Sequence, residues 1–317
     1  MARAKLGVTH QGSPLAGRIE FAMAMGARAG QGGWHDGVSG RARAPGVSKL
    51  TKALGTIFGS VSDVNIEPVA CLSDNFAYLI WHDGTRKALV VDPSEAAPVQ
   101  QALQQRELEL GAILCTHHHW DHVGGVKELC ECHAGLPVFA SDHDVPRIEG
   151  ATRGLADGES FEEAGLRFEC MKVPGHTLGA LAYYVENAVF TGDTLFGAGC
   201  GRLFEGTPAQ MHASLMRLAA LPGSTRVYFG HEYTRANLTF ARSIEPENEA
   251  VRARLQRADV TKISCTTPST IEEERATNPF LRCAELSVRA SLGEGFVRAS
   301  DVETFAELRR RKDSFRS

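Results

Sequence analysis

Several features that define common protein classes are missing from this 317-residue sequence. No run of apolar residues approaches the roughly 18 that a membrane-spanning helix needs, so we expect no membrane association. The formal net charge of −4 gives no reason to expect a nucleic acid partner. The eight cysteines follow no zinc-ribbon spacing, and several lie in apolar, strand-like runs where a free thiol behaves as a small hydrophobe. These absences indicate an ordinary globular protein kept in a reducing compartment.

The Gly-x-Ser-x-Gly pattern of serine hydrolases is absent as well, whereas histidine is concentrated in one short stretch. Residues 116–122 read Thr-His-His-His-Trp-Asp-His, directly after the apolar run Leu110–Cys115, which predicts a buried strand. Four side chains of this stretch can bind a metal: His117, His119, Asp121 and His122. Imidazole and carboxylate together suit zinc, iron or manganese. The alternative, a solvated loop that happens to be rich in histidine, leaves the other ligand candidates of the chain unexplained.

Those other candidates are isolated in the sequence but share one setting. His176, Asp193 and His231 each follow a short apolar strand and a glycine. Alone, each would more often be an ordinary hydrogen-bonded or turn residue. Together they complete two ligand sets, each of which we predict to hold one metal: His117, His119 and His176; Asp121, His122 and His231. Asp193 would bridge the two metals and leave a shared position for water. Such sites keep their ions about 3.5–4 Å apart and indicate catalysis, because structural zinc is closed by four protein ligands.

The rest of the pattern predicts an α/β protein followed by helices. From Asn65 onward, short apolar strands alternate with turns, and helices are expected over 97–108 and between Pro208 and Pro222. This arrangement fits an αββα sandwich with the metals at the sheet edge. Beyond Tyr233 the strand signals disappear, and four segments are typical of helices: 236–243, 248–258, 269–277 and 301–312. We expect this helical tail to pack over the site.

The order of the ligands, His-x-His-x-Asp-His followed by a single His, Asp and His, resembles that of the metallo-β-lactamase superfamily. Four further stretches narrow the resemblance to glyoxalase II, the hydroxyacylglutathione hydrolases: Ser73–Tyr78, Gly199–Thr207, Asn278–Arg282 and Arg309–Phe315. The resemblance extends from about Asn65 to Phe315. It implies an α/β metallo-β-lactamase sandwich followed by an all-helical C-terminal domain.

The same resemblance implies a reaction. Glyoxalase II hydrolyses the thioester of S-lactoylglutathione and related S-acylglutathiones to D-lactate and glutathione, the second step of methylglyoxal detoxification. A hydroxide that bridges two divalent metal ions would attack the thioester carbonyl, and we expect zinc, with iron or manganese as alternatives. Asp121 would orient this hydroxide and Asp193 would bridge the metals. A thiolate leaves readily, so no general acid is expected.

Substrate-binding residues also follow from the resemblance, because family members hold the carboxylates of glutathione with basic residues and a tyrosine. The matching positions are Arg202, Phe204, Tyr233, Arg309 and Lys312. Some relatives have lysine and tyrosine where this chain has Arg202 and Phe204, so the charge is kept but a hydroxyl is lost. We expect Phe204 to contribute packing or its backbone amide. Without the resemblance, Arg309 to Lys312 would be taken for a solvated basic helix end.

Other proteins share part of this pattern. A persulfide dioxygenase with a single iron would keep the first set of histidines and Asp193, but it is not expected to have the helical tail. A lactonase or a β-lactamase would lack the tail as well. Loss of a ligand would favour a non-catalytic metal-binding scaffold, and all seven ligands are present.

The first 62 residues differ from the rest of the chain. They hold eight basic residues against two acidic ones and lack strong periodicity. Such an extension resembles an organelle transit peptide, with a disordered tail or a mis-called start as alternatives. We therefore divide the chain into an extension (1–62), a metallo-β-lactamase-like catalytic domain (63–233) and a helical substrate-binding domain (234–317). We expect a monomer in the cytoplasm, or in a mitochondrion or plastid if the extension is a transit peptide.

Deleting residues 1–62 should leave thermal stability and turnover nearly unchanged, because every motif begins after Asn65. Thermal unfolding and steady-state kinetics of the full and shortened chains check this. Fusing residues 1–62 to a fluorescent reporter tests targeting, and a reporter that stays diffuse in the cytosol would contradict a transit peptide.

Overall fold

Two six-stranded sheets form the centre of the fold. The computed structural model describes residues 64–261 and 265–316, so the predicted extension, 1–62, lies outside the described residues. The strands of the first sheet, in order, are β1 (Val64–Cys71), β2 (Asn75–His82), β3 (Lys87–Val91), β4 (Glu109–Leu114), β5 (Val138–Ser141) and β6 (Arg153–Leu155). β1 to β3 pair antiparallel, whereas β3 to β6 pair parallel. Helical crossovers join β3 to β4 and β4 to β5, as parallel pairing requires.

The second sheet has the strand order β14-β13-β10-β9-β8-β7. Its strands are β7 (Ser160–Glu163), β8 (Leu166–Lys172), β9 (Leu181–Val185), β10 (Ala188–Gly192), β13 (Arg226–Phe229) and β14 (Ser269–Thr270). A small hairpin of β11 (Leu195–Phe196) and β12 (Gly199–Cys200) follows β10. This hairpin begins two residues after Asp193, so it borders the predicted site.

The strand β14 shows that the expectation of a tail without strands was wrong. Ser269 and Thr270 pair antiparallel with Val227 and Arg226 at the edge of the second sheet. The helix that we expected over 269–277 therefore begins at Ile271, and the Thr270 side chain caps it by accepting a hydrogen bond from the Glu273 amide. A two-residue edge strand has no periodicity that a sequence can reveal.

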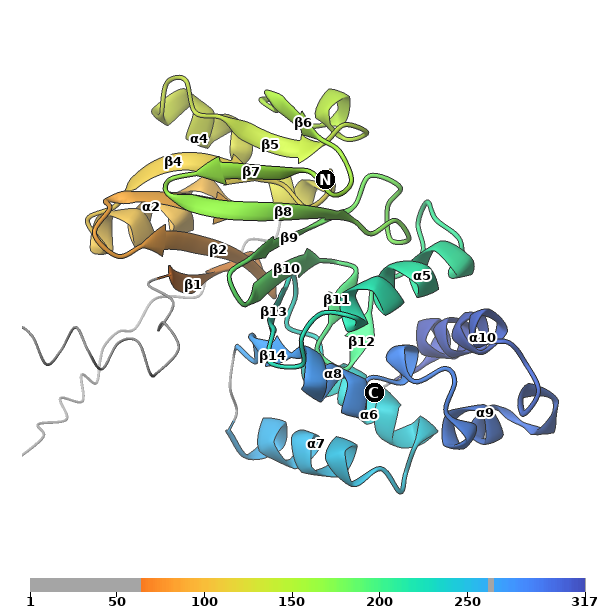
Figure 1. Cartoon of the computed structure of the whole chain (residues 1–317). Helices are drawn as coiled ribbons and strands as arrows, with labels where there is room; N and C mark the ends of the chain where they lie inside the picture. Colours follow the sequence, from red (N-terminus) through yellow and green to blue (C-terminus); the bar gives the residue numbers. More distant parts are fainter. Residues whose placement is uncertain (1–63, 262–264, 317) are drawn as a thin grey trace, which may run out of the picture. The chain divides into compact units, whose positions relative to one another are not determined.

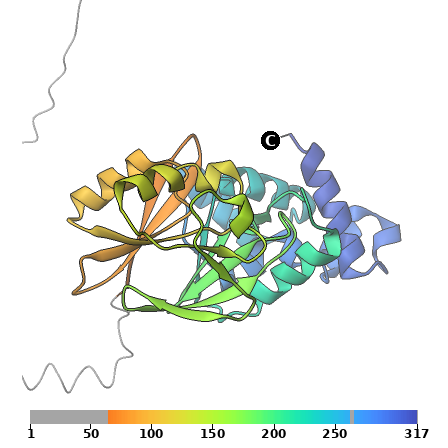
Figure 2. The ribbon, with the colours of Figure 1, turned by 90° about the horizontal axis from the view of Figure 1, so that it is seen from above.

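The two sheets pack face to face through large apolar side chains. Phe139 of the first sheet stacks on Phe161 of the second at 4.6 Å between ring centroids, and Phe161 stacks in turn on Phe168. Helices α2 (Ala96–Gln105) and α4 (Val126–Cys132) cover the outer face of the first sheet (Figure 2). Helix α5 (Pro208–Ala219), predicted between Pro208 and Pro222, packs on the second sheet. The expected αββα sandwich is thus confirmed.

The tail is mainly helical, and its helices share a core with the second sheet. They are α6 (Thr234–Ile244), α7 (Glu249–Thr261), α8 (Ile271–Thr277), α9 (Leu286–Leu292) and α10 (Asp301–Ser314). Phe305 of α10 belongs to the same buried cluster as Met211 of α5 and Phe229 of β13. In Figure 1 the tail helices α6 and α8 lie beside the β11–β12 hairpin. Within residues 64–261 and 265–316, none of the helices has the length and apolar character needed to cross a bilayer.

The predicted metal ligands follow strand ends at one edge of the sandwich. β4 ends just before the histidine-rich stretch, β10 just before Asp193, and β13 two residues before His231. The short helix α3 (Trp120–Val123) turns the chain after β4 and carries Asp121 and His122. Strand ends from both sheets therefore bring residues that are far apart in the sequence to one place.

Candidate metal centre

Three histidines of the first predicted set lie with their ring nitrogens turned to a common point. Nδ1 of His119 lies 3.1 Å from Nε2 of His117 and 3.0 Å from Nε2 of His176. Atoms bound at about 2.0–2.1 Å to one tetrahedral zinc ion stand about 3.3 Å apart. The spacing of these nitrogens therefore fits three ligands of a single metal.

The second predicted set is brought together in the same way. Nε2 of His122 lies 3.3 Å from Nε2 of His231, which in turn lies 3.4 Å from Oδ2 of Asp121. The Asn75 amide holds Asp121 in place by donating to its carbonyl oxygen at 2.9 Å and to Oδ2 at 3.3 Å. Two imidazoles and one carboxylate thus form a second group able to bind a metal.

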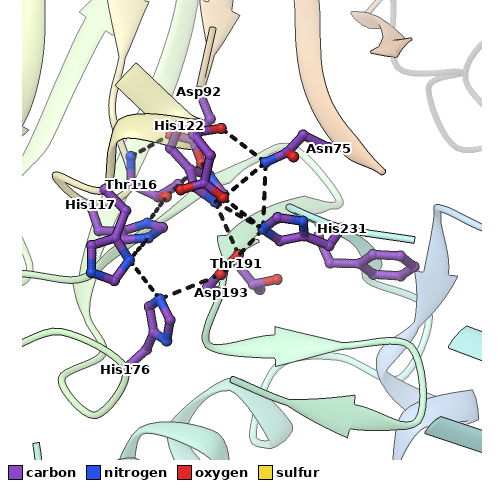
Figure 3. Close-up of polar contacts among 12 residues, drawn as sticks. Asn75, Asp92, Thr116, His117, His122, His176, Thr191, Asp193 and His231 are labelled. Carbon is purple, nitrogen blue, oxygen red and sulfur yellow. Dashed lines mark hydrogen bonds and ion pairs between the residues drawn. The ribbon is translucent and has the colours of Figure 1, made fainter. Parts of the chain in front are cut away.

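Asp193 lies between the two groups (Figure 3). Its Oδ1 lies 3.2 Å from Nε2 of His122, and its Oδ2 lies 3.4 Å from Nε2 of both His176 and His231. Within the described part of the chain, Oδ1 is buried and, despite this contact with His122, accepts no hydrogen bond of good geometry. A buried carboxylate oxygen left in this state is costly unless a cation binds it. The donor atoms therefore fit two metal ions that share the Asp193 carboxylate.

The outward-facing nitrogens of three histidines are fixed by hydrogen bonds. Nδ1 of His122 donates to Asp92 at 2.9 Å, Nδ1 of His231 donates to Asp74 at 2.8 Å, and Nδ1 of His176 donates to the Arg202 carbonyl oxygen at 2.9 Å. Each bond places the proton on Nδ1 and leaves Nε2 free to bind a metal. The tautomers required for metal binding are therefore set by the surrounding chain.

Asp92, Asp74 and Asn75 hold predicted ligands in place and were not among the residues predicted from the sequence. Asp92 is buried, has φ 49°, and also accepts hydrogen bonds from the amide and the hydroxyl of Thr116 at 2.7 and 2.6 Å. A non-glycine residue with positive φ is uncommon, and these bonds stabilise it. The signal was present, because Asp92 directly follows the apolar strand β3 just as Asp193 follows β10.

The charges of the two histidine groups differ. Burial lowers the pKa of His117 well below its usual value and lowers that of His119 to about 4, so both rings are neutral near pH 7 and can bind a metal. Burial also acts against the charged forms of His122 and His231, but the Asp193 carboxylate together with neighbouring carboxylates outweighs it and raises the pKa of both. The second group therefore attracts positive charge, which a divalent cation can supply.

A cavity of about 700 Å³ opens over the two groups. Its floor contains His119, Asp121, His176, Asp193 and His231. The five residues predicted to bind substrate all line its walls: Arg202, Phe204, Tyr233, Arg309 and Lys312. The fold therefore brings the predicted chemical and substrate-binding residues to one cavity, although their individual roles stay predictions.

Two aromatic rings lie against the histidine groups inside this cavity. The Phe204 ring is 5.5 Å from that of His119 and 5.2 Å from that of His176. The Tyr233 ring stacks on His231 at 4.8 Å with an interplanar angle of 4°. Phe204 is 64% exposed and Tyr233 38%. Each ring thus borders one of the two groups and also faces the cavity.

The two predicted cations of α10 have different surroundings. Arg309 is only 6% exposed: its Nη1 donates to the Cys200 carbonyl oxygen at 2.9 Å, while Nε and Nη2 contact Asp313 at 3.0 and 2.8 Å. The Lys312 ammonium donates to the Ala236 carbonyl oxygen at 3.2 Å, which leaves two of its protons for other partners. Arg309 therefore ties α10 to the β12 strand, whereas Lys312 is better placed to meet a ligand.

Comparison with known proteins agrees with this geometry. The sequence model of the metallo-beta-lactamase superfamily matches residues 73–231, and that of the hydroxyacylglutathione hydrolase C-terminus matches residues 232–315. The hydroxyacylglutathione hydrolase of Photobacterium profundum is 44% identical, and that of Cupriavidus taiwanensis 48%. Each alignment covers 80% of this chain and 100% of the relative.

Solved structures share the sandwich. ETHE1 from Myxococcus xanthus is 25% identical with a TM-score of 0.56, over 78% of this chain and 90% of that one. TTHA1623, solved in a di-iron-bound form, is 28% identical with a TM-score of 0.50, over 68% of this chain and 100% of that one.

The sandwich and its two neighbouring ligand groups are those of the metallo-β-lactamase superfamily. The match of the C-terminal part and the relatives that align over 80% of the chain support a narrower assignment. The chain belongs to the hydroxyacylglutathione hydrolases, the glyoxalase II family of thioester hydrolases, as its motifs predicted.

Gly230→Ala should disrupt the metal centre while leaving the fold intact. A Cβ atom at this position would lie 2.6 Å from Oδ1 of Asp193 and 2.6 Å from Cε1 of His122, so a ligand must move. A misplacement of about 1 Å can cost about 100-fold in rate. We expect a loss of that order together with reduced metal content by elemental analysis. Gly295→Ala is the matched control, because nothing lies within 4 Å of its Cβ position. Wild-type metal content and rate in Gly230→Ala would contradict the arrangement.

Proposed function

We propose that this protein hydrolyses the thioester of S-lactoylglutathione and related S-acylglutathiones to D-lactate and glutathione, the second step of methylglyoxal detoxification. The observation that carries the proposal is the shared Asp193 carboxylate at the floor of a cavity that has Arg202 and Lys312 on its wall. Two neighbouring metal sites of this kind are typical of enzymes that catalyse hydrolysis. Cationic side chains can bind the carboxylates of a substrate. Relatives that align over their full length carry the name of this activity.

The residues present suit two divalent metal ions, and we propose zinc in both positions, with iron or manganese as alternatives. The first would bind His117, His119 and His176, the second Asp121, His122 and His231, and Asp193 would bind both. Bound there, the ions would lower the pKa of a shared water from about 15.7 to about 7 and polarise the thioester carbonyl. Imidazole and carboxylate ligands accept all three metals.

Asp121 is the residue proposed to orient the attacking hydroxide. Burial acts against its charge, but the hydrogen bond to His231 and the nearby charge of His122 lower its pKa to about 2. The carboxylate is therefore ionised at neutral pH and can accept a hydrogen bond from the nucleophile. The Asn75 amide fixes its position. Because thiolate is a good leaving group, no side chain need act as general acid.

The glutathione part of the substrate is proposed to lie along the tail side of the cavity. Arg202 and Lys312 would meet its carboxylates, and the half-exposed Tyr233 would offer its hydroxyl. Phe204, which has no hydroxyl, would contribute packing beside His119 and His176 rather than on the tail side. Arg309 would add its fixed charge to the wall and hold the Cys200 carbonyl oxygen in place. The protein would act as a monomer without nucleic acid or membrane partners.

The chain's division into an extension (1–62), a catalytic domain (63–233) and a helical substrate-binding domain (234–317) is also proposed. Localisation would be cytoplasmic, or in a mitochondrion or plastid if the extension is a transit peptide.

The purified protein should hydrolyse S-D-lactoylglutathione and contain two metal ions per chain. Asp193→Ala should lose both metals or hold them weakly, and its activity should fall by several orders of magnitude, because one carboxylate serves both ions. Loss of thioester absorbance and elemental analysis measure these quantities. One tightly bound metal in a fully active wild-type protein would overturn the two-metal mechanism, and a single iron would favour the dioxygenase alternative.

Lys312 should make glutathione binding depend on pH. Burial, and then the charge of Arg309, lowers its pKa from 10.5 to about 8, so the ammonium is charged below pH 8 and loses its charge as the pH rises through 8. KM should therefore rise above pH 8, while kcat changes little. Lys312→Ala should raise KM roughly tenfold to a hundredfold, because a hydrogen bond to a charged group contributes about 1.5–3 kcal/mol to binding.

Lys312→Arg is the matched control, because arginine stays charged and KM should not rise near pH 8. A small thioester without carboxylates should be hydrolysed equally by all three proteins. An unchanged KM for S-D-lactoylglutathione in Lys312→Ala would remove Lys312 from the binding site.

A further inference from the structure

Trp120 has no role in the proposed hydrolysis, yet it lies between residues of the two predicted ligand groups. It is the first residue of α3, between His119 of the first ligand group and Asp121 of the second. Its side chain is 71% exposed and lines the cavity above these groups. A large apolar ring in such a place is typical of a surface that a ligand covers.

Phe204 adds a second exposed ring on the same side. The Phe204 ring packs edge to face against His119, the residue that precedes Trp120. Phe196 also lines the cavity, but it is only 4% exposed and offers little contact area. Trp120 follows His119 in the chain and Phe204 packs against the His119 ring, so both bring exposed aromatic side chains to this part of the cavity.

The cationic side chains Arg202 and Lys312 lie on the side of the cavity that the helical tail forms. Arg202 is two residues before Phe204, but its Nε lies 3.9 Å from the Asp313 carboxylate on α10. Lys312 also belongs to α10 and contacts α6 through the Ala236 carbonyl oxygen. The cavity is therefore cationic toward the helical tail and aromatic beside His119.

A thioester has two arms on opposite sides of its carbonyl carbon. With the carbonyl at the ligand groups and the glutathione arm directed to the tail cations, the acyl arm must extend away from the tail. Trp120 and Phe204 are exposed aromatic side chains that line the cavity outside the tail. We propose that these two rings form the binding surface for the acyl group and that Trp120 gives the protein its selectivity for acyl groups with an aromatic substituent. The assignment rests on the proposed hydrolysis of glutathione thioesters.

The consequence is a specific change in selectivity. S-mandeloylglutathione differs from S-lactoylglutathione by a phenyl ring in place of a methyl group, so only the acyl arm changes. A phenyl ring can stack on an indole in offset or edge-to-face geometry, whereas a methyl group covers little of it. Trp120 should therefore lower the transition-state energy for the mandeloyl substrate much more than for the lactoyl substrate.

The test compares kcat/KM for both substrates in wild type, Trp120→Ala and Trp120→Phe. We expect Trp120→Ala to lower the mandeloyl-to-lactoyl ratio about tenfold or more, and Trp120→Phe to retain most of it because a ring remains. The ratio is independent of the fraction of active enzyme, so a partial loss of metal next to Trp120 cannot produce the effect. Leu286→Ala is the matched control: Leu286 is 68% exposed on α9, does not line the cavity, and should leave the ratio unchanged.

Binding provides a second measurement. S-(4-nitrobenzyl)glutathione is a thioether that cannot be hydrolysed, and its nitroaryl group quenches a tryptophan that it contacts. We expect it to quench the fluorescence of the wild type and to have little effect on Trp120→Phe, whereas S-methylglutathione should quench neither. Equal quenching of both proteins would overturn the contact.

The outcomes separate this inference from the proposed function. A wild type that hydrolyses both glutathione thioesters, with a ratio that Trp120→Ala leaves unchanged, would overturn the acyl surface alone. A metal-loaded wild type that hydrolyses neither thioester would overturn the proposed function and the acyl surface together.

Discussion

The burial of one carboxylate among imidazoles is the constraint on which the rest of the structure depends. Asp193 lies at the end of β10, and removing its charge from water is tolerated only because positive charge can surround it. Without a metal, that charge has to come from His122 and His231, whose pKa values Asp193 raises. The sheet edge is therefore organised around a cation before any substrate arrives, and the strands that end there are positioned to supply its ligands.

The helical tail completes the site by fixing the hairpin that follows Asp193. The buried carboxylate of Glu274 accepts a hydrogen bond from the Ala198 amide at 2.8 Å and pairs with Arg254 at 2.7 Å. The Asn278 side chain donates to the Gly199 carbonyl oxygen at 2.9 Å, and Arg309 contacts the next residue. All of these bonds are buried and all but that of Asn278 involve a charged group, so they hold a loop more firmly than surface pairs do. The wall that carries Arg202 is thus rigid because distant helices hold it.

The sequence could single out candidate ligands that the fold brings together, because metal chemistry restricts residue types and spacing so strongly. A histidine-rich stretch and single residues after glycines suffice to indicate both groups. The layer behind them was not predicted, since Asp74 and Asp92 lie 157 and 30 positions from the histidines that they hold. The position of Asp92 after an apolar strand marks it as a candidate, but only the folded geometry shows which histidine it holds. The surroundings of Arg309 were hidden for the same reason: a basic helix end gives no sign that a backbone carbonyl from another element lies beside it.

The two-residue strand β14 has a consequence for how the halves of the chain can be combined. By pairing with β13, it covers the backbone groups at an edge of the second sheet, which would otherwise be open to pairing with other chains. A chain cut after β13 would lose the helices and also expose that edge. Exchange of tails between relatives would therefore succeed only when the incoming segment restores the same edge pairing. The second sheet and the tail should accordingly unfold as one cooperative unit.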